Sequence, residues 1–221
     1  MKARTARALV LDFGGVISKT LFETHDLTEA ALGLAPCSLK WLGPFALESD
    51  PLWASMQRGE ISERDYWLTR SREVGHLVGE DWRDMETFVK RARGADPEAV
   101  IRPEAERAIR LVGDAGFKLA ILSNELDLFY GADFRRKLPL LDRFQAIIDA
   151  TYTKVLKPDP RAYQMVLDEL SLDPDLCVFV DDQQRNIVGA QACGLQTVLF
   201  DVRDPRTSYI EALRPFGLEL N

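Results

Sequence analysis

Residues 8–14 read Ala-Leu-Val-Leu-Asp-Phe-Gly, an aliphatic run that ends in a carboxylate and a glycine. Because the run is short, rich in aliphatic residues and followed by Gly14 and Gly15, it predicts a buried strand that leads into a tight turn. Asp12 would then stand at the carboxyl end of that strand, where open α/β sheets bind their ligands. The stretch therefore predicts the first strand of a sheet and the first residue of a polar site.

The same pattern returns four times later in the chain. Each further apolar run finishes in Ser, Asn or Asp, at residues 119–124, 146–149, 177–182 and 196–201. Segments with helical spacing separate or follow these runs, at residues 103–115, 125–137, 160–170 and 183–193. Strands that alternate with helices are typical of α/β proteins, so the sequence predicts a parallel, doubly wound sheet.

The alternation stops in one long segment after the first strand. From about residue 18 to about residue 99 the chain carries only helical patterns, such as residues 62–74, which begin with a capping box. We therefore predict an α/β core from residues 1–17 and 100–221, with residues 18–99 as an inserted helical domain. All four tryptophans fall in the insertion, where we expect them to form its core or in part to face the substrate.

Charge and composition narrow the possible partners. The net charge of −7 argues against nucleic acid, for which a basic face would be expected. No apolar run is long enough to span a membrane, and the apolar stretch before Asp12 is too short for a signal peptide. Three cysteines are too few for a disulfide framework, which favours a reducing compartment. We expect a cytoplasmic monomer or homodimer without nucleic acid or membrane partners.

Polar residues with matching chemistry stand at or after the predicted strands: Asp12, Ser123, Asn124, Lys157, Asp181 and Asp182. In a parallel sheet these positions converge at one edge. Three carboxylates would repel one another there, and a hard cation such as Mg²⁺ would relieve that repulsion. The lysine and the serine hydroxyl would donate to an anionic group. Such a set suits phosphoryl transfer, because a carboxylate can itself form a covalent aspartyl-phosphate.

Taken together, these motifs resemble those of the haloacid dehalogenase (HAD) superfamily, in particular its small-molecule phosphatases with a helical cap after the first strand. The resemblance extends from about residue 6 to about residue 201, although the cap matches in length and helicity only. It implies a Rossmann-like core, with Asp12 as nucleophile and metal ligand and the Gly14 carbonyl facing the metal. It also implies that Ser123 and Asn124, with the neighbouring backbone, bind the phosphoryl group.

The remaining motifs imply the other roles in the site. Lys157 in Leu-Lys-Pro-Asp-Pro resembles the lysine that balances the charge of the nucleophile and the phosphate. The Asp-Asp motif implies Asp181 as a metal ligand, Asp182 as its supporting acid and Asn186 as the residue that orders the loop. The resemblance therefore implies a Mg²⁺-dependent phosphatase whose partner is a small phosphorylated metabolite, for instance a sugar phosphate.

The chain departs from the family pattern at Gly14. Family phosphatases commonly carry an aspartate there, which protonates the leaving oxygen and activates water, help worth about 10²–10⁴-fold. A cap residue such as His25, Lys19 or Glu23 could replace it, or the substrate could have a good leaving group, such as an anomeric oxygen. Substitution of Gly14 by aspartate would test these ideas, unless glycine occupies a backbone geometry that an aspartate resists. A second departure is Lys154, which stands where a glycine often precedes the motif lysine.

Two other functions remain open from the sequence. A 2-haloacid dehalogenase of the same fold also uses an aspartate nucleophile and also lacks the second aspartate. The Asp181 and Asp182 pair favours the phosphatase, because those dehalogenases replace the metal site and need no paired acid. The other alternative is a protein of this fold that has lost turnover and binds a metabolite or a partner. Its one support is Gly14, because the nucleophile, the lysine and the metal acids are all present.

Overall fold

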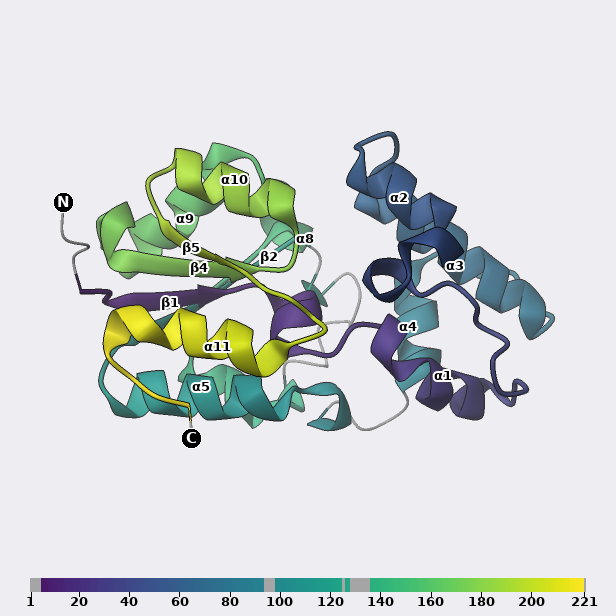
Figure 1. Ribbon diagram of the computed structural model, residues 1–221. Coiled ribbons are helices and arrows are strands. Elements are labelled where there is room, and N and C mark those ends of the chain that lie inside the picture. Colours follow the sequence, from purple (N-terminus) through teal and green to yellow (C-terminus); the bar gives the residue numbers. More distant parts are fainter. Residues whose placement is uncertain (1–4, 94–97, 125, 128–135, 221) are drawn as a thin grey trace. The chain divides into compact units, whose positions relative to one another are not determined.

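The computed structural model describes residues 5–93, 98–124, 126–127 and 136–220 (Figure 1). The described residues divide into two compact units. The first unit contains residues 5–19, 100–127 and 136–220, with position 125 left out, and the second contains residues 20–93 together with residues 98 and 99.

A five-stranded parallel sheet forms the centre of the first unit. Its strands are β1 (Ala8–Leu11), β2 (Lys118–Ser123), β3 (Ala146–Asp149), β4 (Cys177–Asp181) and β5 (Gln196–Leu199), arranged in the order β3-β2-β1-β4-β5. Each neighbouring pair is parallel. The predicted α/β fold with a doubly wound parallel sheet is therefore confirmed. In this register Leu11, the last residue of β1, lies beside Val180 of β4. The next residues, Asp12 and Asp181, therefore stand at the same edge of the sheet.

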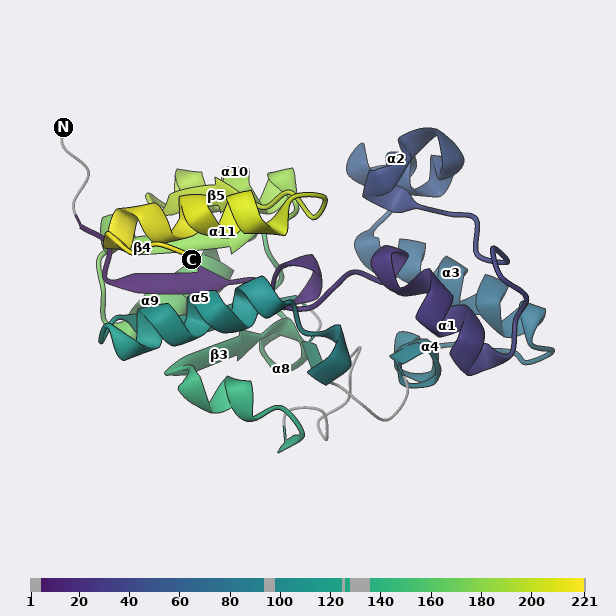
Figure 2. The ribbon, with the colours of Figure 1, turned by 60° about the horizontal axis from the view of Figure 1, so that its bottom comes forward.

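Helices cover both faces of this sheet (Figures 1 and 2). One face carries α5 (Pro103–Asp114) and α11 (Pro205–Leu213), which contact each other. The other carries α9 (Pro160–Leu170) and α10 (Gln184–Ala192), and the short α8 (Ala150–Thr153) follows β3. Three predicted helices are present, whereas the one expected at residues 125–137 falls mostly outside the described residues.

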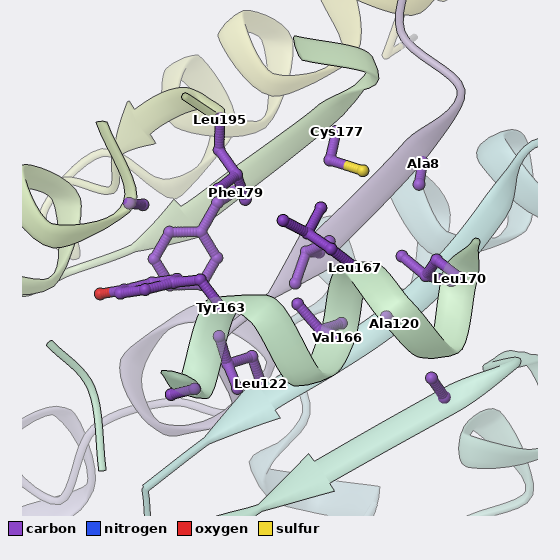
Figure 3. Packing of buried hydrophobic residues seen from close by; sticks show 14 of the residues in the cluster. Ala8, Ala120, Leu122, Tyr163, Val166, Leu167, Leu170, Cys177, Phe179 and Leu195 are labelled. Atoms are coloured by element: carbon purple, nitrogen blue, oxygen red, sulfur yellow. The ribbon is translucent and has the colours of Figure 1, made fainter. Parts of the chain in front are cut away.

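The helix α9 shows why these segments fold as they do. Asp159 accepts a hydrogen bond from the Arg161 backbone N–H and Pro160 occupies the first turn, so the start is both capped and preorganised. Its apolar side chains recur at helical spacing and are buried against the sheet: Ala162, Tyr163, Val166, Leu167 and Leu170 (Figure 3). The Tyr163 ring meets the Phe179 ring of β4 edge to face at 5.6 Å. Burial of each large apolar side chain contributes about 1.5–3 kcal/mol.

The described residues of the second unit form helices and the loops that connect them. It contains α1 (His25–Leu32), α2 (Pro51–Gln57), α3 (Glu63–Leu77) and α4 (Met85–Arg93). The predicted capping box is present, because Ser62 and Asp65 exchange hydrogen bonds at the start of α3. All four tryptophans are buried in the cluster that forms the core of this unit, together with Phe22, Tyr66 and Phe88.

The chain leaves and re-enters the first unit at neighbouring points. Ser18 and Ile101 form an antiparallel bridge, Lys19 N–H donates to the Val100 carbonyl at 2.8 Å and Arg102 N–H donates to the Ile17 carbonyl at 3.0 Å. The two connecting segments are therefore hydrogen-bonded to each other within the first unit. Among the helices that the structure describes, none combines the length and the apolar content that crossing a bilayer requires.

Candidate active site

Three carboxylates meet at the carboxyl edge of the sheet. Asp12 follows β1 and its N–H donates to the Val180 carbonyl at 2.9 Å, which fixes it beside the end of β4. One ligand oxygen from each of Asp12, Asp181 and Asp182 lies within 4.8 Å of the others. Asp181 is fully buried, and the other two are partly exposed. The convergence that the sequence predicts for these acids is thus what the structure shows.

Lys157 brings one positive charge between two of these acids. Its Nζ atom lies 2.9 Å from Asp12 Oδ1 and 2.7 Å from Asp181 Oδ2, and its side chain is 1% exposed. The ammonium also lies 5.5 Å from the centre of the Phe179 ring. A buried lysine is tolerated only when it is paired, so the two carboxylates explain how Lys157 can be buried here.

Asn124 holds the backbone of the lysine loop. Its Oδ1 accepts a hydrogen bond from Lys157 N–H at 2.7 Å, and its Nδ2 donates to the Lys157 carbonyl at 3.2 Å. The side-chain amide therefore positions the lysine, a role that sequence reasoning missed, while a substrate contact of Asn124 stays a prediction. Ser123 ends β2 and is nearly buried, and among the described residues its hydroxyl has no hydrogen-bond partner.

Asp181 is oriented by a network from the start of α10. Its Oδ1 accepts hydrogen bonds from Gln183 N–H at 2.8 Å and from Asn186 Nδ2 at 3.0 Å. Asn186 is itself held by Tyr163, whose hydroxyl donates to the Asn186 carbonyl at 2.7 Å. The role of Asn186 in ordering this loop stays a prediction from the resemblance, and the contacts of Gln183 and Tyr163 were not predicted. Nothing in the local sequence distinguishes Tyr163 from an ordinary apolar position of α9.

The backbone after Asp12 makes a tight turn through Phe13–Ile17. Gly15 has a φ of +79°, in the left-handed region that favours glycine. Gly14 differs, because its φ is −70° and its ψ is 127°, which any residue can adopt. A Cβ atom at position 14 would meet no atom within 4 Å. The idea that backbone geometry excludes an aspartate from position 14 is therefore wrong.

The backbone conformation at Lys154, the second departure, explains why glycine is common at this position. Its φ of +59° and ψ of 14° place it in the left-handed region at the C-cap of α8. This is the conformation for which glycine is usually selected. The exposed Lys154 side chain turns back to its own helix end, where Nζ donates to the Thr151 carbonyl at 2.5 Å.

Acidic groups are concentrated in the site. Burial raises the pKa of Asp12 to about 7; the nearby Lys157 ammonium opposes this rise and Asp181 adds to it. Burial alone would lower the pKa of Lys157, but the two carboxylates outweigh it and raise that pKa. The cluster has three carboxylates and Lys157 pairs with two of them, so it can accept a further cation. Because all of its donors are oxygens, it fits a hard divalent cation.

The candidate replacements for the missing acid have other contacts. Glu23 accepts hydrogen bonds from the Thr20 N–H and hydroxyl, each at 2.8 Å. His25 lies edge to face on Trp41 at 4.4 Å, and burial lowers its pKa to about 4. A neutral imidazole of this kind is a poor proton donor at neutral pH. Lys19 lies in the connecting segment, where its backbone pairs with Val100.

The sequence is similar to a known protein family and to several known proteins. Residues 6–194 match the haloacid dehalogenase-like hydrolase family. The chain is 35% identical to protein CbbY of Cupriavidus necator over 206 residues, which cover 87% of this chain and 77% of that protein. It is 28% identical to phosphatase MT3486 of Mycobacterium tuberculosis over 198 residues, which cover 88% and 87%.

Two further similarities are more limited. The chain is 34% identical to mouse acyl-CoA dehydrogenase family member 10 over 172 residues, which cover 76% of this chain and only 15% of that protein. A solved structure described as a dehalogenase matches with a TM-score of 0.58 at 20% identity, and the match covers 89% of this chain and 85% of that one. This last likeness concerns the fold alone.

Proposed function

This chain belongs to the haloacid dehalogenase-like hydrolases, and from that premise we propose that it is a Mg²⁺-dependent phosphatase that hydrolyses a small phosphate monoester through a phosphoaspartate on Asp12. The observation that carries the proposal is the cluster of Asp12, Asp181 and Asp182, whose ligand oxygens lie within 4.8 Å of one another beside the Lys157 ammonium. A phosphatase among the relatives supports the same activity.

The cation would be held by residues of the first unit. We expect Asp12, Asp181 and the Gly14 carbonyl to bind Mg²⁺, with Asp182 beside them in the same cluster. When bound, Mg²⁺ would neutralise negative charge on the phosphoryl oxygens during transfer. Lys157 lies between Asp12 and Asp181, and a divalent cation held by the three carboxylates would reduce the repulsion among them.

The side chains of this protein would carry two displacements at phosphorus. An Asp12 carboxylate oxygen forms a bond to phosphorus while the bond to the leaving oxygen breaks and its electron pair stays with that oxygen. Water then attacks the phosphorus, which releases inorganic phosphate and restores the Asp12 carboxylate. Lys157 keeps a positive charge beside Asp12 in both steps, and the Ser123 hydroxyl donates to a phosphoryl oxygen.

Gly14 narrows the substrate class within this proposal. Without a general acid at position 14, the rate should depend steeply on the acidity of the leaving group, and p-nitrophenyl phosphate or a sugar 1-phosphate should react much faster than a sugar 6-phosphate. The phosphoaspartate should accumulate and give a burst of product. Because the backbone at position 14 accepts a side chain, Gly14→Asp should raise turnover of the sugar 6-phosphate by about 10²-fold. Equal rates for both sugar phosphates in the unaltered protein would contradict this.

The deciding experiment compares two reactions in the same preparation. Phosphate release from p-nitrophenyl phosphate, a sugar 1-phosphate and a sugar 6-phosphate is measured with Mg²⁺ and with EDTA, and chloride release from 2-chloropropionate is measured in parallel. We expect phosphate release that requires Mg²⁺ and no chloride release. Asp12→Asn is the matched control, since it removes the nucleophile and keeps the side-chain shape.

A dehalogenase is the second candidate, and two observations favour it. The chain is 31% identical over 141 residues to (S)-2-haloacid dehalogenase 4A of Burkholderia cepacia, and position 14 is a glycine where family phosphatases commonly carry a second aspartate. Chloride release without added metal, together with no phosphate release, would establish this alternative. Absence of both products would favour the binding protein without turnover.

A further inference from the structure

The loop after Asp12 is held by two buried side chains that the proposed reaction does not use. Arg102 Nε donates to the Gly15 carbonyl at 2.9 Å, and the Tyr209 hydroxyl donates to the Val16 carbonyl at 3.1 Å. Arg102 is 3% exposed and Tyr209 is fully buried. Both hydrogen bonds end on consecutive carbonyls of the turn that connects the nucleophile to the rest of the chain.

One aromatic ring joins these two donors into a single support. The Arg102 guanidinium carbon lies 5.6 Å from the centre of the Phe200 ring, and the Phe200 and Tyr209 rings meet edge to face at 5.2 Å. An aromatic face stabilises a guanidinium that has lost water. We name Arg102, Phe200 and Tyr209 the loop clamp. Its members come from the return segment, the end of β5 and α11, so three distant parts of the sequence hold one turn.

The turn needs such support because its own backbone is permissive. Two consecutive glycines have more conformational freedom to lose than any other pair of residues. At one end the turn is anchored by Asp12 N–H on the Val180 carbonyl, and Ser18 N–H closes it on the Phe13 carbonyl. The Gly14 carbonyl lies between the anchored Asp12 and the Gly15 carbonyl that Arg102 holds. Its direction therefore depends on the loop clamp.

We propose that Arg102 and Tyr209 are positioning residues that keep the backbone of residues 12–16 in the geometry that binds the cation. The inference rests on the proposed function, because the cation is the one that Asp12 and the Gly14 carbonyl would hold. A displacement of about 1 Å at reacting groups can cost about 10²-fold in rate. The loop clamp acts on cation binding and on the direction of Asp12, and it touches neither substrate nor cation.

The test separates positioning from general stability. Magnesium affinity is measured by titration calorimetry on the full chain without substrate, alongside kcat, KM and the melting temperature. The variants are Tyr209→Phe, which removes one hydroxyl, Arg102→Met, which removes the donor, and Arg102→Lys, which keeps a positive donor. Val166→Ala is the control, because it destabilises the buried core of α9 without contact to the turn.

We expect Arg102→Met to weaken Mg²⁺ binding by at least about 10-fold, in the range measured for residues that orient metal ligands. Tyr209→Phe should weaken it by about threefold, since the other donor remains. Arg102→Lys should recover part of the affinity. At saturating Mg²⁺, kcat should fall while KM stays unchanged. Val166→Ala should melt at a lower temperature and bind Mg²⁺ as the unaltered protein does.

The opposite pattern would overturn the inference. If Tyr209→Phe and Arg102→Met bind Mg²⁺ like the unaltered protein while they melt earlier, the loop clamp is structural only. Should Arg102→Met fail to fold, Tyr209→Phe decides alone, because its ring still packs on Phe200. Failure of the proposed function has a different signature: the unaltered protein binds Mg²⁺ and releases no phosphate from any ester. If the two variants still weaken Mg²⁺ binding in that case, the positioning role is supported.

Discussion

Each unit of the molecule contains a buried carboxylate paired with a cation, but the two pairs differ in how many carboxylates meet there. In the second unit, Asp50 accepts hydrogen bonds from Trp53 N–H at 2.8 Å, from the Tyr66 hydroxyl at 2.6 Å and from Arg70 at 2.5 Å. In the first unit, Lys157 serves Asp12 and Asp181 together, and Asp182 joins the same cluster.

The difference separates a structural ion pair from a site for chemistry. Asp50 has one cation and a donor for each oxygen, so the pair fixes how α2 and α3 pack and requires nothing further. In the first unit, three carboxylates come within 4.8 Å of one another at the carboxyl edge of the sheet, an arrangement of oxygens that suits a hard cation. Burial and pairing alone do not identify an active site; the convergence of several acids at this edge does.

The largest effect on activity should come from the cluster of Asp12, Asp181 and Asp182. We expect Asp12→Asn to lower phosphate release by at least about 10³-fold, because the amide cannot act as the nucleophile. Its melting temperature should stay within a few degrees of the original value, since the variant keeps its shape and removes a charge whose pKa burial raises. Substantial turnover by Asp12→Asn would remove Asp12 from the mechanism.

Substitution in the Asp50–Arg70 pair should instead affect stability rather than activity. Asp50→Asn removes the buried carboxylate beside Arg70 and leaves the half-exposed Glu73 as its remaining partner, and we expect it to lower the free energy of unfolding by about 3 kcal/mol. Activity per folded molecule should change little at a temperature where the variant is folded. The measurement is urea unfolding followed by tryptophan fluorescence, which suits a unit that contains all four tryptophans. A stable Asp50→Asn variant with lost activity would undo the comparison.

His25 gives the second unit a dependence on pH. Burial lowers its pKa from an ordinary value of about 6.5 to about 4, and its Nε2 atom is buried without a hydrogen-bond partner among the described residues. Between these two pKa values the unfolded chain binds a proton that the folded chain does not. The stability is therefore present above about pH 6.5 and is lost as the pH falls through 4.

We expect His25 to account for up to about 2 kcal/mol of that loss, after an allowance for the partial exposure of the ring. Unfolding free energies at pH 7 and pH 4.5 for the unaltered protein and for His25→Phe measure it. The phenylalanine keeps a ring against Trp41 and cannot take up a proton. Parallel pH dependence in the two proteins would mean that other groups are responsible.

The smallest effect concerns the strained backbone near the site. Lys154 and Ser171 both have positive φ at the C-caps of their helices, α8 and α9. Lys154→Gly should raise the free energy of unfolding by about 0.5–1 kcal/mol, because glycine adopts this conformation without steric cost. Ser171→Gly, placed on the other helix, should give a similar gain and serves as the matched control. A loss of stability in Lys154→Gly alone would show that the lysine side chain matters more than the backbone.

Local sequence pattern predicted the residues whose roles depend on position along a strand. Asp12 and Asp181 could be found because parallel strands place their carboxyl ends at one edge, and the tryptophans because a small helical unit must bury its large side chains. Lys157 could be selected as a polar residue near the strand ends, but its role in balancing the charge of the nucleophile required the resemblance to a known family. The helix α11 was missed: it is short, and its buried face includes Ser208 beside Tyr209, which weakens the apolar periodicity.

Roles that depend on contacts between distant segments could not be predicted. The bond between Asn124 and the Lys157 backbone spans 33 positions, and the pair of Asp50 with Arg70 spans 20. No local period encodes such distances, because only the folded chain brings the partners together. The backbone conformations at Gly14 and Lys154 were also hidden, since glycine permits many angles and lysine normally avoids the left-handed region.

The bridge between Ser18 and Ile101 bears on how much the length of the inserted segment affects the stability of the sheet. Because the chain departs and returns at hydrogen-bonded neighbours, residues 20–99 are, for the sheet, one long surface loop whose ends are already joined. The entropic penalty of closing such a loop grows only with the logarithm of its length, by about 0.6 kcal/mol for each doubling. Insertions or deletions within residues 20–99 should therefore change the loop-closure part of the stability of the sheet very little.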